Sequence, residues 1–505
     1  MKKILLLIFL VHITACVSGK KIEKETKKYD ENWDSLAKHK ESPDWFSDSK
    51  LGIYFHWGVY SVPAFGGEWY PRNMYIPGHG FNKHHLETYG DLQEFGYHDF
   101  VPMFKAEKFD AKAWVDLFEK AGARFAGPVA EHHDGFSMWD SEVTPWNSMA
   151  KGPKKDILGE LKRELDKKNM KLIATFHHSK QLQRYNGKEE SAKEHHFKDS
   201  HYPMYPGLEP ERSKELDYLY GNIPEDKWLE DIWFGKLKEV IDKYNPDIMW
   251  FDSWLDRIPE DYRAKFCAYY LNEAEKWNKE VVIVRKQDDL PLDFSVDDLE
   301  KSRKNKMGDK VWMTDETISK GSWCYTENLT IKPTKDVLHV LIDIVSKNGV
   351  LLLNVSPKAD GSIPLNQQQV LLGMGDWLKK YGEAIYGTRP WFTYGEGPTK
   401  EPDGHFKNAK KFLKVKYSDK DVRYTTKERT IYATILGKPD SEKLITLEAF
   451  KKENASRIGK IDKVEVLGST GEITWRLTEG GLQLKMPKLV PDEMAIVVKI
   501  VTKPL

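Results

Sequence analysis

The chain has 505 residues, more than one ordinary domain holds, and its 40% hydrophobic and 31% charged residues are typical of a soluble globular protein. Lys and Arg together number 78, as do Asp and Glu, so the formal net charge is zero. This balance removes the electrostatic argument for a nucleic-acid partner, and the composition excludes a disordered or membrane-embedded chain.

Residues 1–18 have the composition of a signal peptide. Two lysines precede Ile4 to Val11, an apolar stretch too short to span a bilayer. The tetrapeptide ending at Cys16 resembles the processing site of a bacterial lipoprotein, which would make Cys16 a lipidated first residue. The alternative is an ordinary signal peptide cleaved near Ala15 or Ser18. We therefore expect secretion across the inner membrane, to the periplasm or to the outer membrane as an anchored lipoprotein.

Residues 19–40 are highly charged and nearly free of aliphatic side chains, so we expect a solvated linker there. Besides Cys16 the chain contains only Cys267 and Cys324. No disulfide framework is therefore expected to hold the fold.

Residues 41–388 alternate short apolar runs with amphipathic helical segments, the pattern of βα units around a parallel sheet. This repeat predicts an α/β fold, a (β/α)8-like TIM barrel that forms the catalytic domain. The predicted strands are 51–56, 124–130, 171–176, 248–251, 281–284, 310–314 and 350–354. One further strand is weakly signalled, and we place it near Trp323. The predicted helices include 112–123, a segment striped by apolar residues from Ile157 to Leu165, 228–241 and 337–345.

Residues 389–505 change to short runs that approximate a period of two, separated by turn residues. This pattern predicts a C-terminal antiparallel β-sandwich. The predicted strands are 430–436, 444–450, 464–467, 473–477, 482–486 and 494–500. No constellation of carboxylates or histidines occurs there, so we expect a structural or accessory role.

The apolar run Ile248 to Phe251 ends abruptly in Asp252. A lone aspartate after a strand is usually a helix N-cap or a partnered carboxylate. A functional interpretation gains weight because other predicted strands also end in polar groups, and a parallel barrel gathers its strand ends on one face, where it builds its active site. These groups are His56, Glu131-His-His-Asp134, His177-His178, Arg285 and Asp315-Glu316. Imidazoles, an arginine, indoles and a carboxylate suit a neutral, polyhydroxylated ligand.

A metal site is the rival interpretation, because four sequential histidine pairs occur: His84-His85, His132-His133, His177-His178 and His195-His196. Adjacent side chains on a strand point to opposite faces, so such a pair cannot chelate one ion as His-x-His can. Neither His-x-His nor His-Glu-x-x-His occurs in the chain. We therefore expect no metal.

Several motifs recur together in the chain: His56-Trp-Gly58, Glu68-Trp69, His132-His-Asp-Gly-Phe136, Trp250-Phe-Asp252, Ser322-Trp323 and Gly382-Glu-Ala-Ile-Tyr386. They resemble the motifs of one family, the retaining α-L-fucosidases of glycoside hydrolase family 29. They fall in the family's order across residues 41–390, and together they are specific where each alone is weak. The resemblance implies a barrel with a C-terminal β-sandwich, no cofactor, and release of terminal L-fucose by double displacement.

By resemblance, Asp252 matches the nucleophile, which must stay ionised; we expect Arg285 and neighbouring histidines to favour that state. Residues that match positions around the sugar are His56, Glu68, Trp69, His132, His133, His178, Trp250 and Arg285. For each, the alternative is a polar residue satisfied within the barrel core, and Glu68 can equally orient a histidine.

The acid/base residue is less clearly marked, because the family supplies it from a variable loop. Many members have Trp-Glu at the strand that here reads Trp312-Met313. We favour Glu300, which lies twelve positions before Trp312 in an acidic stretch, where related enzymes commonly place an acidic residue. Glu316 and Asp315 are the alternatives, and the ordinary explanation of Glu300 is a solvated surface charge.

The expected substrates are fucosylated glycans or oligosaccharides derived from fucans. Two other functions stay open: a related exo-glycosidase for a sugar with the same hydroxyl pattern, such as an α-L-galactoside, and an inactive carbohydrate-binding barrel. We expect the insertion from Asn186 to Pro224 to form a rim over the leaving-group side. Asn328, Asn354 and Asn454 fit the glycosylation pattern, although Asn354 ends a predicted core strand.

Overall fold

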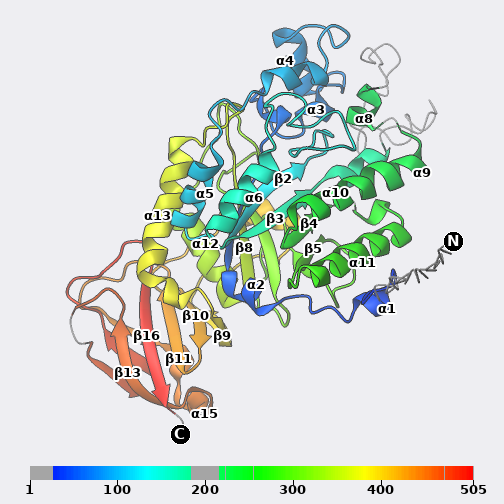
Figure 1. The fold of residues 1–505 in the computed structure, drawn as a ribbon. Coiled ribbons are helices and arrows are strands. Elements are labelled where there is room, and N and C mark those ends of the chain that lie inside the picture. The colour runs from blue at the N-terminus through cyan, green and yellow to red at the C-terminus, as the bar shows by residue number, and fades with distance from the viewer. Residues whose placement is uncertain (1–26, 184–214, 222, 254, 471–472, 504–505) are drawn as a thin grey trace, which may run out of the picture.

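A computed structural model describes residues 27–183, 215–221, 223–253, 255–470 and 473–503 (Figure 1). A barrel wrapped by helices occupies most of the molecule, and a smaller β-rich part lies beside one end of it. The predicted signal peptide and Cys16 lie outside the described residues, as does most of the predicted insertion.

Eight parallel strands close the barrel, each pairing with the next along the chain and β8 pairing with β1. They are β1 (Leu51–Phe55), β2 (Phe125–Glu131), β3 (Lys171–Phe176), β4 (Ile248–Phe251), β5 (Val282–Lys286), β6 (Val296–Asp298), β7 (Trp312–Thr317) and β8 (Gly349–Val355). The predicted barrel is therefore confirmed.

Side chains from alternate strand positions fill the barrel interior, including Ile248 and Trp250 of β4 and Val282 and Val284 of β5. Because successive side chains of a strand face opposite sides, this alternation also decides which residue beyond a strand end faces the top of the barrel.

Helices pack around the barrel because their apolar stripes need cover. The longer ones are α4 (Gly80–Thr88), α5 (Ala111–Lys120), α6 (Ile157–Lys167), α10 (Gly235–Tyr244), α11 (Glu260–Lys276), α12 (Thr334–Ser346) and α13 (Leu365–Tyr381). The shorter ones are α1 (Trp33–Leu36), α2 (Asp44–Ser49), α3 (Tyr70–Asn73), α8 (Leu216–Tyr220), α9 (Glu225–Lys227), α14 (Ala409–Phe412) and α15 (Ala455–Ile458). The predicted helix 228–241 begins as a π-helical segment, Trp228–Phe234, that continues into α10.

The strand that we placed near Trp323 was wrong. Trp323 lies in a loop whose next residue, Cys324, makes a single bridge to His56, and the missing strand is β6, within the stretch that we interpreted as an acidic loop. The strand that carries Asp315, β7, is consequently the seventh in the barrel and not the sixth.

The solvated linker expected over residues 19–40 was wrong for its described part, 27–40. Tyr29 and Leu36 are buried, the Nδ2 group of Asn272 on α11 donates to the carbonyl of Tyr29 at 2.8 Å, and Trp33 stacks on Phe294. This segment is part of the barrel's outer packing.

The C-terminal part forms two antiparallel sheets. The five-stranded sheet has the order β13 (Lys460–Val466), β16 (Ile496–Lys503), β11 (Thr430–Ile435), β10 (Val422–Lys427) and β9 (Arg389–Glu396), and the three-stranded sheet has the order β12 (Leu444–Leu447), β15 (Gly481–Lys485) and β14 (Trp475–Thr478). Both sheets contribute to one apolar cluster, as a sandwich requires. β9 and β10 are the strands that the sequence pattern missed.

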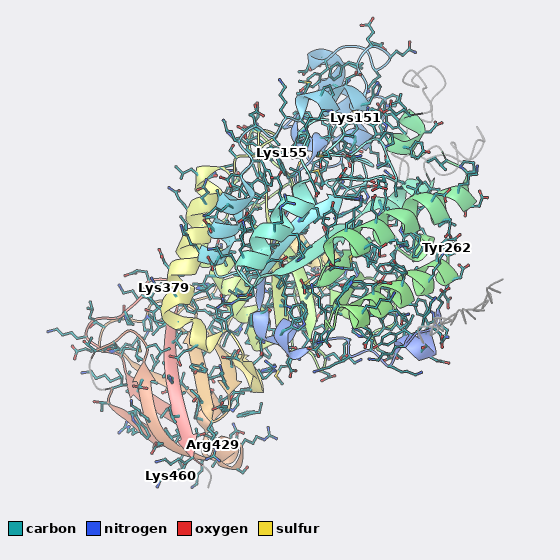
Figure 2. All side chains as sticks on the ribbon, in the orientation of Figure 1. Lys151, Lys155, Tyr262, Lys379, Arg429 and Lys460 are labelled. Atoms are coloured by element: carbon teal, nitrogen blue, oxygen red, sulfur yellow. The ribbon has the colours of Figure 1, made fainter. Side chains whose placement is uncertain are left out.

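Side chains fill the space between the barrel and its helices and between the two C-terminal sheets (Figure 2). Within the part of the chain that the structure describes, no helix is long and apolar enough to cross a membrane.

Candidate active site

A cavity of about 600 Å³ opens where the barrel strands end. Its wall contains most of the residues that the sequence singled out: His56, Glu68, Trp69, His132, His133, Asp252, Arg285, Asp315 and Glu300. It also contains residues that were not singled out as site residues, chief among them His177, Lys180, Lys286, Asp298 and Trp323.

Asp252 stands just beyond β4, and its backbone amide donates to the carbonyl of Phe176 at 3.0 Å, which continues the β3–β4 pairing by one residue. Its Oδ2 lies 3.3 Å from Nδ1 of His177 and 3.5 Å from Nε2 of His133. Burial opposes ionisation, but Lys286 and His177 hold the pKa of the Asp252 carboxyl well below its usual range. The side chain is therefore a buried carboxylate that stays charged.

Lys286 is the basic group at the centre of the cavity floor. Its Nζ lies 3.1 Å from Oδ1 of Asp252, 3.1 Å from Oε2 of Glu300 and 3.1 Å from Oδ2 of Asp315. Burial opposes its charge, yet these carboxyl groups raise the pKa of Lys286 well above its usual range. One ammonium group therefore connects three acidic side chains.

Glu300 follows β6 and faces the cavity two positions beyond Asp298. Burial raises its pKa to about 7, and Asp315 and Asp252 add to this shift, while Lys286 opposes it. Asp252 and Glu300 thus lie in one site with pKa values moved in opposite directions, the arrangement that separates an ionised carboxylate from a protonated acid.

Asp298 and Asp315 form the deeper part of the same cluster. Burial, followed by the charge of Asp315, raises the pKa of Asp298 well above its usual range. Asp315 accepts a hydrogen bond from the hydroxyl of Tyr54 at 3.0 Å. We therefore expect Asp298 to be protonated beneath the cavity.

Three histidines from three different strands meet beside Asp252. The rings of His56, His132 and His177 have centroids 4.6 to 5.5 Å apart. Burial lowers the pKa of both His56 and His132 well below the usual range, and it lowers the pKa of His133 to about 3. The imidazoles of His56, His132 and His133 are therefore neutral. In the described part of the chain, Nδ1 of His132 and Nε2 of His177 are buried and have no hydrogen-bond partner.

Two indole rings complete the wall. Trp323 stacks on His56 with centroids 5.2 Å apart, and Trp69 lies 4.8 Å from the ring of His133. Glu68 does not orient a histidine; its Oε2 accepts from Oγ of Ser322 at 3.1 Å and from the amide of Trp323 at 3.3 Å. Glu68 therefore holds the loop that carries Trp323.

Two residues expected around the sugar lie outside the cavity, and a third lines it with another partner than expected. His178 lies outside the cavity, stacked on Trp233 and bonded to its carbonyl at 3.3 Å, and His177 takes its place. Trp250 is fully buried below Lys286, whose Nζ lies 4.8 Å from the ring centroid. Arg285 lines the cavity but pairs with Asp297 and Asp288, not with Asp252. The expectation that Arg285 keeps Asp252 ionised was wrong; Lys286 does so.

Glu316, the alternative acid, faces the outside of the barrel. Its Oε1 pairs with Nζ of Lys332 at 2.8 Å and accepts from the amide of Thr317. It lines a different hollow, beside α12. Asp315 lies in the floor of the cavity and Glu300 lies in its side wall. Of the three candidates for the acid, Glu300 is therefore the one that faces the cavity from the side wall.

Two groups of side chains in the cavity have the geometry of metal ligands, although neither is a pair of histidines adjacent in the sequence. His56, His132 and His177 bring ligand atoms within 4.8 Å of one another, and so do His133, His177 and Asp252. Each set takes its groups from different strand ends, so it does not depend on a sequential histidine pair. Imidazoles suit a metal ion, but Lys286 beside Asp252 already supplies positive charge there.

The sequence and the fold were compared with known proteins. A family model described as α-L-fucosidase matches residues 16–383, and one described as the α-L-fucosidase C-terminal domain matches residues 416–503. The chain belongs to the α-L-fucosidase family. This confirms the resemblance to glycoside hydrolase family 29.

Individual relatives agree with this assignment to the α-L-fucosidase family. The tissue α-L-fucosidase of Rattus norvegicus is 30% identical over 493 residues, which cover 93% of this chain and 90% of that protein. The human tissue α-L-fucosidase is 28% identical and covers 98% of this chain and 96% of its own length. A crystal structure of Thermotoga maritima α-fucosidase in complex with fucose superposes with a TM-score of 0.71 at 28% identity, covering 94% of this chain and all of the other.

His177 was named only as a strand-end group, and Lys286 was missed, although a signal for both exists in the sequence. Ile173 of β3 and Val282 and Val284 of β5 point into the barrel, so the two-residue period of a strand brings His177 and Lys286 to the same side. Of their neighbours, His178 falls on the other side, whereas Arg285 lines the cavity but pairs with Asp288 and Asp297.

Proposed function

We propose that this protein is a retaining α-L-fucosidase in which Asp252 is the nucleophile and Glu300 the acid/base. One observation carries the proposal. Because Lys286 Nζ is 3.1 Å from an oxygen of each residue, those two oxygens lie no more than twice that distance, about 6 Å, apart. So close an approach favours the separation of about 5 to 5.5 Å between the carboxyl groups of retaining enzymes over the separation of about 6.5 to 9.5 Å in inverting enzymes.

The first step joins the sugar to the enzyme. An ionised oxygen of Asp252 attacks the anomeric carbon and forms an ester, while Glu300 gives its proton to the glycosidic oxygen, which leaves as an alcohol. The raised pKa of Glu300, about 7, keeps that proton available near neutral pH.

The second step reverses these roles. The Glu300 carboxylate takes a proton from water, the resulting oxygen attacks the anomeric carbon, and the ester bond to Asp252 breaks. Fucose is released with its configuration retained, and both carboxyl groups return to their starting states. The neutral His56 and His132, together with His177, would bind sugar hydroxyls, and Trp323 would face an apolar patch of the ring.

A panel of aryl glycosides tests this function. We expect turnover of the α-L-fucoside, weaker or no turnover of the α-L-galactoside, and an α-configured first product by NMR. Asp252→Asn should lower kcat by about 10⁴-fold or more, because the bond-forming group is lost. Asp256→Asn, an exposed aspartate on the next turn, is the matched control. Binding without turnover would instead identify a carbohydrate-binding barrel.

We further propose that the natural substrates are fucosylated glycans or fucan oligosaccharides, and that the chain is exported and anchored through a lipid on Cys16. The apolar stretch after the two N-terminal lysines supports export. Labelling with a radioactive fatty acid tests the anchor: wild-type protein should incorporate label, and Cys16→Ser should not. Label in neither, with processed protein in the periplasm, would favour an ordinary signal peptide.

A further inference from the structure

One wall of the cavity comes from outside the barrel. Gly404, His405 and Lys407 line the same cavity as Asp252 and Glu300, although they follow β9 of the five-stranded C-terminal sheet. The C-terminal part, expected to be structural or accessory, therefore reaches the candidate active site.

This wall, residues 403–407, is attached to the loop that follows Glu300. A Cβ atom on Gly404 would lie 2.5 Å from the carbonyl oxygen of Arg303, so the two backbones touch and only glycine fits. The Nδ2 group of Asn305 donates to Oδ1 of Asp403 at 2.5 Å. The position of the wall is therefore fixed relative to the proposed acid.

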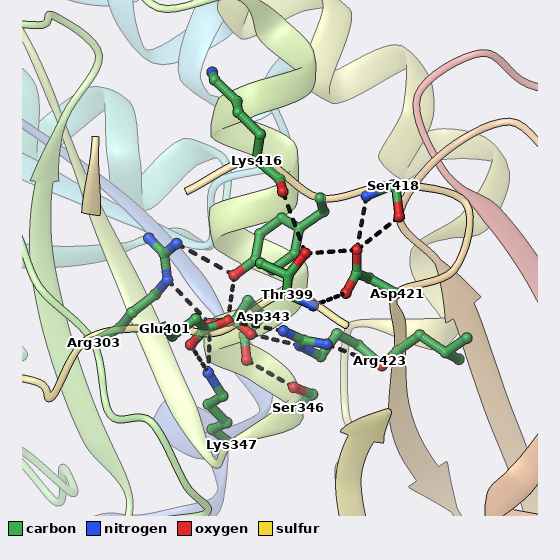
Figure 3. A network of polar contacts seen from close by, with 12 residues as sticks. Arg303, Asp343, Ser346, Lys347, Thr399, Glu401, Lys416, Ser418, Asp421 and Arg423 are labelled. Carbon is green, nitrogen blue, oxygen red and sulfur yellow. Dashed lines mark hydrogen bonds and ion pairs between the residues drawn. The ribbon is translucent and has the colours of Figure 1, made fainter. Parts of the chain in front are cut away.

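A buried ionic network holds both segments from behind (Figure 3). Glu401 accepts from Nη2 of Arg423 at 2.8 Å and pairs with Lys347, the residue that follows α12. Arg423 and Arg303 both pair with Asp343 of α12, at 2.6 Å and 3.1 Å. The loop after Glu300 and the chain leading into the wall thus share one anchor.

The wall offers polar groups to a ligand. Nδ1 of His405 accepts from the amide of Lys407 at 3.1 Å, so the neutral ring carries its proton on Nε2 and can donate from it. Both residues are exposed, and among the described residues no ion pair involves Lys407. The cavity wall contains more acidic side chains than lysines and arginines, so the surface suits a neutral sugar better than a polyanion.

We propose that residues 403–407 form the binding surface for the sugar that leaves, with His405 and Lys407 bonding its hydroxyl groups. The wall adjoins the residues just after the proposed proton donor, and that donor must face the leaving-group oxygen. The C-terminal part thereby contributes to the choice of substrate. This inference rests on the proposed function.

The test compares two substrates: a fucosylated lactose trisaccharide, whose leaving sugar is large, and a nitrophenyl α-L-fucoside, whose leaving group is small. In the His405→Ala/Lys407→Ala variant of the full chain, we expect the ratio of kcat/KM for trisaccharide over aryl fucoside to fall about tenfold. Lys410→Ala, an exposed lysine of the same segment outside the cavity, should leave both values unchanged.

A second variant separates the surface from its support. Glu401→Gln weakens the anchor without touching the cavity, so the ratio should fall in the same direction. An unmoved ratio, or an equal loss on both substrates, in the double variant and in Glu401→Gln would overturn the inference. If the wild-type protein turns over neither fucoside, the proposed function fails instead.

Discussion

Two buried ionic clusters lie on either side of the loop after Glu300, and they differ in the ratio of positively charged groups to carboxyl groups. In the cavity floor, Lys286 is shared by the carboxyl groups of Asp252, Glu300 and Asp315, with Asp298 close behind. Beside α12, Asp343 and Glu401 meet three cations, Arg303, Lys347 and Arg423. A cluster short of positive charge retains protons, whereas one with enough positive charge keeps every carboxylate ionised. The first can therefore do acid chemistry, and the second can only hold segments together.

Glu300→Gln removes the proton that the cavity cluster retains. We expect kcat/KM for the trisaccharide to fall by about 10² to 10⁴, with a smaller loss for the aryl fucoside, whose leaving group needs little protonation. In the wild type, activity should decline as pH rises through about 7, since the acid must be protonated, and this limb should vanish in the variant.

Glu316→Gln is the matched comparison, because Glu316 pairs with Lys332 outside the cavity. In the Glu316→Gln variant, activity should still decline as pH rises through about 7, which is the basic limb of the profile. Loss of that limb in Glu316→Gln, but not in Glu300→Gln, would exchange the two assignments.

Lys286→Met makes the cavity cluster still poorer in positive charge. The ammonium lowers the pKa of both Asp252 and Glu300, so its loss should raise both. We expect the acid and basic limbs of the kcat/KM profile to move together to higher pH, with reduced activity at the optimum. Lys306→Met, an exposed lysine after Glu300, should leave both limbs in place. If kcat/KM falls but both limbs of its pH profile keep their positions, Lys286 only shapes the cavity.

Asp343→Asn breaks the balanced cluster. We expect a loss of about 3 to 5 kcal/mol in the free energy of unfolding, because three buried cations lose a shared partner. Lys347 and Arg423 hold the pKa of the buried Asp343 carboxyl below its usual range. Its stabilisation is therefore complete above about pH 4 and is lost as pH falls below that.

The control for Asp343 lies on the same helix. Asp336 pairs with Lys416 near the surface, and Asp336→Asn should cost no more than about 1 kcal/mol. Denaturant titrations at pH 7 and pH 3.5 measure both variants. Equal costs for the two substitutions would remove the distinction between a buried anchor and a surface pair.

The barrel was predictable because its helices carry apolar stripes and most of its strands are continuous apolar runs. β6 was not predicted because it is three residues long and two of them are Asp297 and Asp298. Aspartate has a low β-propensity, so these residues are expected in a loop. Asp298 is tolerated inside only because neighbouring groups share its proton and charge, which is tertiary information.

Within the cavity, the strand ends alone indicated Asp252, and the acidic stretch before Trp312 indicated Glu300; the structure brings both to one site. Inward parity would also have selected His177 and Lys286 over their neighbours. No sequence signal points to His405 and Lys407, because their place depends on docking between segments about a hundred residues apart in the chain.

Asn354, at the end of β8, has a practical consequence for producing the protein. Its side chain is fully buried, accepts from the amide of His56 at 2.9 Å and donates to the carbonyl of Trp323 at 2.7 Å. A glycan attached to Asn354 during synthesis in a eukaryotic secretory pathway would occupy the space where β1 and the Trp323 loop must meet. Hosts without N-glycosylation avoid that obstacle to closing the barrel. In a host that glycosylates, Asn354→Gln would prevent the glycan, but the longer side chain would lose the hydrogen bonds that Asn354 makes.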